Sequence, residues 1–78
     1  MTCFVYILKS QKDGKRYVGL TDDIERRIKQ HNVGRVVSTR SRRPFVLERF
    51  EEFSDRVTAR VREKYYKTAA GRRFLDKL

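Results

Sequence analysis

Two tyrosines near the start of the chain are the first residues whose type and spacing could do chemistry. Two apolar segments there flank Asp13-Gly14, a pair that is a strong signal for a β-hairpin. If the hairpin loop is centred on that pair, Tyr6 and Tyr17 lie on one face with Gly19 beside them. A glycine inside a strand often marks the close approach of a ring, a backbone or a ligand. The hairpin would then present two phenols around bare backbone, although ordinary amphipathic strands would give the same spacing.

An arginine and a glutamate further along the chain have helical spacing relative to apolar neighbours. Arg27 lies beside the apolar stripe of its segment, which predicts a guanidinium at the edge of the hairpin face. A solvated Arg27 that pairs with Asp23 is the alternative. Glu63 interrupts a row of small and aromatic residues, which is typical of an inward or cleft-lining acid. A surface ion pair with Lys67 is the alternative for Glu63.

The composition narrows the metal chemistry that is open to the chain. Cys3 is the only cysteine and His31 the only histidine, which excludes an internal disulfide, a thiolate cluster and a histidine-based metal site. Cys3 lies in an apolar run and is predicted to be a small core residue. Any metal would have to be held by carboxylate oxygen and water, which suits Mg²⁺ or Mn²⁺ rather than zinc.

The length and charge of the chain indicate one small domain, residues 1–78, with a polyanionic partner. Lys and Arg number 20 against 10 Asp and Glu, a formal net charge of +10. Such an excess favours nucleic acid first and an anionic membrane surface second. No apolar run approaches the length of a membrane-spanning helix, and the first residues lack the pattern of a secretory signal. We therefore expect a soluble, cytoplasmic protein that does not span a membrane and whose first candidate partner is nucleic acid.

Positive charge is concentrated in residues 32–44, which we interpret as a loop. Guanidinium groups mixed with hydroxyls suit phosphate oxygens, so this loop is a candidate nucleic-acid contact. A solvated loop that only favours solubility is the alternative. The turn before the second apolar segment adds two more candidates, and the full set is Lys15, Arg16, Arg35, Arg40, Arg42 and Arg43.

Three strands are expected to form the sheet that positions the hairpin. Residues 3–8 are an unbroken apolar run, typical of a central strand buried on both faces, and residues 16–20 form its hairpin partner. Residues 45–53 read as the third strand. Strict alternation would place Phe45, Leu47 and Phe53 on one of its faces and Val46 and Phe50 on the other. Its acidic residues are assigned to edges and solvent, namely Glu48, Glu51 and Glu52.

The first helix is expected after the hairpin, within residues 21–32. Asp22 can cap it, and Glu25 three residues later can complete a capping box. Ile24 and Ile28 then set the buried stripe, which His31 continues by one turn.

A longer helix is expected from its cap at Ser54 to about Ala70, ending at Gly71 in a left-handed conformation. Two rows of its residues have helical spacing. The row predicted to be the main buried stripe is Val57, Val61 and Tyr65, and the second row is Ala59, Glu63, Tyr66 and Ala70. A short amphipathic helix that seals the core is expected from Phe74, Leu75 and Leu78.

Taken together, these residues resemble the GIY-YIG nuclease superfamily, and specifically its small single-domain bacterial members, across almost the whole chain. The two signature tripeptides appear as Phe4-Val5-Tyr6 and Tyr17-Val18-Gly19. Arg27 stands at the position of the family's arginine and His31 at that of a histidine found in many members. Arg62-Glu63-Lys64 resembles the segment that bears the acidic metal ligand. Phe4 replaces the first glycine, and the asparagine that excision-repair and homing relatives carry has no counterpart after Glu63.

The resemblance implies an α+β fold, a three-stranded antiparallel sheet flanked by helices, and metal-dependent hydrolysis of a phosphodiester. Mg²⁺ or Mn²⁺ would be held by Glu63, and Arg27 would hold the scissile phosphate. Tyr17 or Tyr6 would take a proton from water, with His31 either supporting one of them or simply packing. A phenol, with an ordinary pKa of about 10, needs nearby cations to act as a base at neutral pH.

The leading functional hypothesis is therefore an endonuclease acting on DNA, with branched or damaged structures as candidate substrates and a targeting protein as a candidate partner. The alternative is a nucleic-acid-binding module on the same scaffold that cleaves little or nothing. A basic RNA-associated protein is the third hypothesis, which the aromatic residues disfavour because they fall at core spacing.

Overall fold

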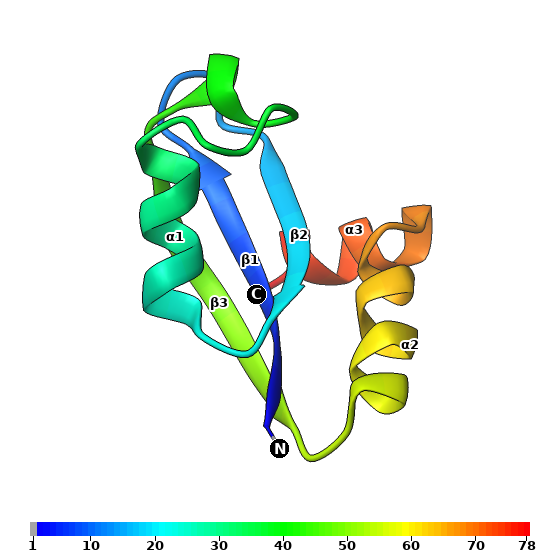
Figure 1. The fold of residues 1–78 in the computed structure, drawn as a ribbon. Coiled ribbons are helices and arrows are strands. Elements are labelled where there is room, and N and C mark those ends of the chain that lie inside the picture. The colour runs from blue at the N-terminus through cyan, green and yellow to red at the C-terminus, as the bar shows by residue number, and fades with distance from the viewer. Residues whose placement is uncertain (1) are drawn as a thin grey trace.

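The apolar run that opens the chain forms the central strand of the sheet. In the computed structural model, which describes residues 2–78, β1 (Cys3–Ser10) lies between β2 (Arg16–Thr21) and β3 (Phe45–Phe53), and all pairing is antiparallel (Figure 1). β1 pairs on both edges and is covered on both faces, which explains its continuous apolar sequence. Cys3 is buried in the core, as predicted. The predicted α+β fold, with a three-stranded antiparallel sheet flanked by helices, is confirmed.

The hairpin between β1 and β2 has the predicted register. Tyr6 lies opposite Gly19 and Leu8 opposite Tyr17, so the two tyrosines share one face. The turn contains Gly14 with φ of 72°, a left-handed conformation that glycine adopts without strain. The Asp-Gly pair therefore sets the register of the whole edge strand.

The predicted faces of β3 are wrong, because the β1–β3 ladder contains a bulge. Ile7 pairs with Arg49 and Leu8 pairs with Leu47, so one extra residue of β3 lies between them. The bulge puts Phe45 in the cluster of Tyr6 and Leu8, whereas Phe53 packs against the cluster on the opposite face. Strict alternation cannot anticipate this change of face, since the extra residue inverts the pattern from that point onward.

Helix α1 (Ile24–Asn32) covers the face of the sheet that carries Tyr6 (Figure 1). The cap is Asp23 rather than the predicted Asp22, and its side chain accepts a hydrogen bond from the Arg26 backbone N–H. Asp22 instead forms an ion pair with Arg26 at 2.7 Å. With Asp23 as the cap, Arg26 occupies the third helical position, so the predicted capping box with Glu25 does not form.

The segment after α1 is the expected loop, interrupted by a short 3₁₀ helix, η1 (Arg40–Arg42). Across this segment Asn32, the last residue of α1, is bonded to Phe45 at the start of β3. Its side-chain amide donates to the Phe45 carbonyl at 3.0 Å, and its carbonyl oxygen accepts from the Phe45 N–H at 2.8 Å. These two hydrogen bonds fix the end of α1 to the start of β3.

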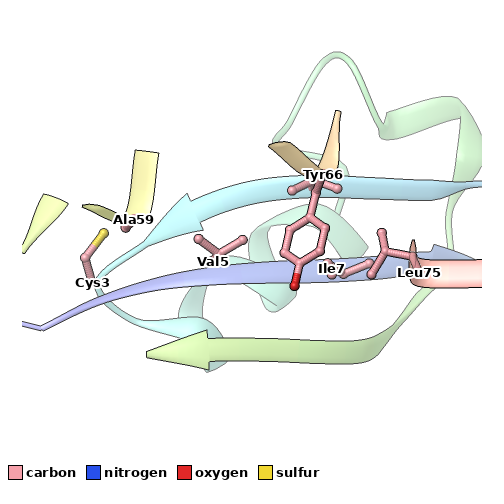
Figure 2. Close-up of a cluster of buried hydrophobic side chains, with 7 residues drawn as sticks. Cys3, Val5, Ile7, Ala59, Tyr66 and Leu75 are labelled. Atoms are coloured by element: carbon pink, nitrogen blue, oxygen red, sulfur yellow. The ribbon is translucent and has the colours of Figure 1, made fainter. Parts of the chain in front are cut away.

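Helix α2 (Arg56–Tyr66) covers the opposite face, and the prediction of its main buried stripe is wrong. Val57 and Val61 are 77% and 65% exposed, while Ala59, Glu63 and Tyr66 are buried. Figure 2 shows Ala59 and the ring of Tyr66 within the cluster formed by Val5, Ile7 and Leu75. Both rows have the same spacing, and the row with small Ala59 lies against the sheet because it allows the helix to come closer. The cap of α2 is Asp55, one residue after the predicted Ser54.

The second half of the expected long helix is a separate element, α3 (Ala69–Asp76). α2 ends at Tyr66 and Thr68 caps α3 by accepting a hydrogen bond from the Gly71 N–H at 3.1 Å. Gly71 is therefore inside a helix and does not end one, contrary to the prediction. Of the predicted sealing residues Leu75 is buried and Leu78 is exposed. Within residues 2–78, no helix is long and apolar enough to span a bilayer.

Gly71 lets α3 pack against the end of α2, and this close approach gives a testable prediction. A Cβ atom at Gly71 would overlap the backbone carbonyl of Tyr65, which cannot move aside as a flexible side chain can. Gly71→Ala should therefore lower the free energy of unfolding by about 1–3 kcal/mol, although alanine is the better helix former. Urea unfolding measures this difference. An increase in stability, as helix propensity alone predicts, would show that the two helices do not pack as described.

Candidate active site

The side chain of Tyr6 crosses the neighbouring strand at a residue that has no side chain. A Cβ atom at Gly19 would lie 2.5 Å from the Tyr6 hydroxyl oxygen, so only glycine leaves room for the phenol. The hydroxyl lies 2.9 Å from His31 Nε2 and accepts a longer hydrogen bond of 3.4 Å from Arg27 Nε. Three of the predicted site residues, from β1 and α1, therefore meet at one hydroxyl group.

The hydrogen bonds around His31 determine its tautomer. His31 is fully buried, and its Nδ1 lies 2.8 Å from Thr39 Oγ1, which in turn donates to the Val36 carbonyl at 3.4 Å. If Nδ1 carries the proton, Nε2 accepts from Tyr6 and every donor in this chain has an acceptor. The other tautomer would leave the buried Tyr6 hydroxyl proton without an acceptor, which costs about 1–3 kcal/mol. We therefore assign the proton to Nδ1 and the donor role to Tyr6.

Burial keeps both partners of this hydrogen bond uncharged. Burial first, and then the nearby positive charge of Arg27, together lower the pKa of His31 from 6.5 to about 4. Burial also raises the pKa of Tyr6, an effect that outweighs the opposing hydrogen bond from Arg27. At neutral pH the site thus holds a neutral imidazole and a protonated phenol.

Tyr17 and Arg27 are less enclosed than Tyr6. The ring centroid of Tyr17 lies 5.0 Å from that of His31 and 6.3 Å from that of Tyr6. Among residues 2–78, none forms a hydrogen bond with the Tyr17 hydroxyl, and none forms an ion pair with Arg27. Arg27 Nη1 donates to Gln30 at 3.0 Å rather than to the alternative partner, Asp23. The site therefore holds one guanidinium whose charge no carboxylate of the described chain neutralises.

Glu63 combines the two alternatives considered for it. It is only 8% exposed, on the inward row of α2, and its carboxylate also pairs with Lys67 at 3.2 Å and Arg60 at 3.8 Å. Burial is the main cause that raises the pKa of Tyr6, and Arg27 opposes it. Tyr17 and, last, the negative charge of Glu63 also raise this pKa. Glu63 is therefore within electrostatic range of the phenol, from a helix on the other face of the sheet.

The predicted nucleic-acid contacts separate into different places. Lys15, Arg16 and Arg42 border one hollow, of about 580 Å³, whereas Arg40 and Arg43 border another of about 420 Å³. Arg35 is exposed elsewhere on the loop. The loop hydroxyls do not all face outward, because Thr39 is fully buried against His31. The predicted contacts other than Arg35 thus border two separate hollows, and their role in binding nucleic acid stays a prediction.

Sequence reasoning missed the contacts that two residues, Glu51 and Thr39, make around the site. Glu51 was assigned to solvent, yet it accepts hydrogen bonds from Arg62 at 3.0 Å and from the Tyr66 hydroxyl at 2.5 Å. Burial would raise the pKa of Glu51, but these two hydrogen bonds lower it overall. Thr39 was also missed as a partner of His31. Both contacts join different elements of the chain, so the periodicity of a single helix or strand does not indicate them.

Comparison with known proteins identifies the family of this site. A family model described as the GIY-YIG catalytic domain matches residues 2–75. The chain belongs to the GIY-YIG family. The two tyrosines, Gly19, Arg27 and Glu63 thus lie within a matched GIY-YIG domain that spans nearly all of the described residues.

Curated relatives and a solved structure agree with this GIY-YIG assignment. The chain is 46% identical over 65 residues to a UPF0213 protein of Clostridium perfringens, covering 82% of this chain and 69% of that protein. It is 44% identical over 66 residues to a UPF0213 protein of Staphylococcus haemolyticus, covering 83% and 79%. The solution NMR structure of a UPF0213 protein from Bacillus halodurans matches with a TM-score of 0.61 and 35% identity, covering 99% of this chain and 84% of that one. The sequence and fold comparisons therefore point to the same group of small GIY-YIG proteins.

The buried, neutral His31 predicts how the stability of this GIY-YIG domain depends on pH. Unfolded chains bind a proton at His31 below about pH 6.5, whereas the folded state does so only below about pH 4. The stability that neutral His31 provides is complete above pH 6.5 and is lost as the pH falls toward 4. Between pH 7 and 4.5 the free energy of unfolding should drop by about 2–3 kcal/mol from this group.

Urea unfolding at a series of pH values measures that drop, and His31→Gln is the matched variant. Carboxylate groups titrate in both proteins, so the difference between the two curves isolates the imidazole. An equal fall in both proteins would contradict a buried, neutral His31.

Proposed function

We propose that this protein is a metal-dependent endonuclease that hydrolyses phosphodiester bonds in DNA. The observation that carries the proposal is the convergence of Tyr6, His31 and Arg27 at one hydroxyl group, with Tyr17 beside them. Membership of the GIY-YIG family supports a nuclease-like role. The net charge of +10 supports a polyanionic substrate.

Arg27 is proposed to bind the scissile phosphate. Its charge is not neutralised by a carboxylate of residues 2–78, while its hydrogen bonds to Tyr6 and Gln30 fix the side chain. A fixed guanidinium can bind two phosphate oxygens at once and stabilise the negative charge that develops as the bond breaks. Because the arginine is already oriented in the absence of substrate, little reorganisation is needed at the moment of reaction.

Tyr17 is proposed to be the base, and Tyr6 a positioning residue. The Tyr6 proton is donated to His31, and burial raises the pKa of Tyr6, so this phenol is held in its protonated form. Tyr17 is half-buried and its hydroxyl has no hydrogen-bond partner within the described chain. In its ionised form it would accept a proton from water as the water oxygen attacks phosphorus. The bond from phosphorus to the leaving sugar oxygen then breaks, and that oxygen takes up a proton from solvent.

The carboxylate of Glu63 would hold the divalent metal. No group of three or more His, Cys, Asp and Glu residues within residues 2–78 is arranged to bind a metal, so the site offers a single carboxylate. Mg²⁺ fits that donor set, since it keeps several waters and uses one or two carboxylates together with substrate phosphates. The cation partners of Glu63 are exposed side chains that can move aside. When bound, Mg²⁺ or Mn²⁺ would neutralise charge on the phosphate and favour ionised groups nearby.

A nucleic-acid-binding module that does not cleave is the second candidate. The observation in its favour is that Lys67 and Arg60 already neutralise Glu63. In this case the same cationic surface would bind DNA while the carboxylate contributed only to stability.

Cleavage assays distinguish the two candidates. With labelled duplex, single-stranded and branched DNA, we expect nicking that requires Mg²⁺ or Mn²⁺, and Glu63→Gln or Arg27→Ala should reduce its rate about 100-fold or more. Glu52→Gln is the control, because Glu52 is an exposed carboxylate of β3. Tight binding without nicking of any substrate would favour the binding module. Full activity in Glu63→Gln would refute the metal site.

The two tyrosines should respond differently to removal of the hydroxyl. Tyr17→Phe should reduce the cleavage rate at least 100-fold and leave a residual rate without the wild-type pH dependence. Tyr6→Phe should lower both rate and stability, because it removes a buried hydrogen bond, but keep the pH profile of the wild type. The reverse assignment would follow if Tyr6→Phe, and not Tyr17→Phe, changed the shape of that profile.

A further inference from the structure

The hollow bordered by Lys15, Arg16 and Arg42, which we call the basic hollow, adjoins the proposed site along β2. It has a volume of about 580 Å³ and lies between the β-hairpin and the helices α2 and α3. Tyr17 lines it, as does Lys67, the ion-pair partner of Glu63. The basic hollow therefore adjoins both the proposed base and the proposed metal ligand.

The walls of the basic hollow carry five cations from separate segments of the chain. Three of them already have acidic partners: Lys67 pairs with Glu63, Arg16 with Glu48 and Asp76, and Arg42 with Asp13. Lys15 and Arg72 form no ion pair with any residue in the described part of the chain. These two side chains, from the hairpin turn and from α3, are available to bind an anion.

The floor of the basic hollow is apolar. Val18, Tyr66 and Leu75 line it as buried members of the core cluster, and Figure 2 labels Tyr66 and Leu75. Tyr17 lies at its border. The half-buried ring of Tyr17 beside this floor suits the flat face of a nucleobase, and the free cations Lys15 and Arg72 suit phosphate oxygens. A base inside a double helix is stacked and paired, so it cannot enter such a hollow.

We infer that the basic hollow binds one unpaired nucleotide next to the bond that is cut, with its base against the apolar floor and its phosphate at Lys15 and Arg72. This inference rests on the proposed function and narrows its substrate class. The substrate would be DNA with a single-stranded segment beside the cleavage point, such as an overhang or a flap. A blunt duplex has no unpaired base to enter the basic hollow, so it would contact only the cations on its walls.

Equilibrium binding in the absence of divalent metal tests the inference separately from cleavage. Fluorescence anisotropy would compare a blunt duplex, a duplex with a short overhang, and the same overhang with abasic sites, all at one salt concentration. We expect the overhang to bind roughly tenfold tighter than blunt duplex, and the abasic overhang to lose most of that gain. Equal affinity for all three DNAs, or equal affinity for the normal and abasic overhangs, would overturn the proposed base contact.

Two arginines of α3 provide matched variants for the location of the contact. Arg72 lines the basic hollow, whereas its neighbour Arg73 is exposed and lies outside it. Arg72→Ala should abolish most of the preference for the overhang, and Arg73→Ala should keep it. Equal effects of the two substitutions would place the unpaired nucleotide elsewhere. A protein that shows the preference but never cleaves would refute the proposed nuclease while supporting the basic hollow.

Discussion

The hydrogen bond from Tyr6 to His31 is the contact on which the rest of the site depends. It connects the central strand to α1, and through Thr39 it also connects the loop that precedes η1. The chain of hydrogen bonds is buried and fully satisfied only if the imidazole is neutral and the phenol protonated. Gly19 leaves the space for this phenol, which is why a residue without a side chain belongs opposite Tyr6. The orientation of Arg27 follows from the same hydroxyl.

A second set of contacts positions Glu63 from the other face of the sheet. The guanidinium of Arg62 lies over the rings of Tyr65, Tyr66 and Phe74, with its carbon 4.6 Å from the Tyr66 centroid, and also pairs with Glu51 on β3. Cation–aromatic and charge-assisted contacts of this kind help to hold α2 and α3 on the sheet. Glu63 and the two tyrosines are thus positioned by two layers that pack on opposite faces of the sheet. The proposed site therefore depends on the sheet that separates these layers.

Local patterns predicted the parts of this arrangement that depend on neighbouring residues. The Asp-Gly turn sets the register that brings Tyr6 and Tyr17 to one face, and β3 has the predicted bounds. The bulge in the β1–β3 ladder, the inward row of α2 and the place of Gly71 inside α3 depend on packing between distant segments. Two rows of equal spacing on α2 cannot be ranked without knowing which one allows the helix to approach the sheet. For the same reason the Thr39 partner of His31 has no signal in the sequence.

The central proposal is that a divalent metal binds at Glu63, within electrostatic range of Tyr6. Paramagnetic broadening by Mn²⁺ in NMR spectra of the protein with a short DNA tests it most directly. The account predicts that backbone amides around Glu63 broaden first, and that Glu63→Gln abolishes this effect. Broadening centred on exposed carboxylates such as Asp22 or Glu52, unchanged in Glu63→Gln, would contradict it.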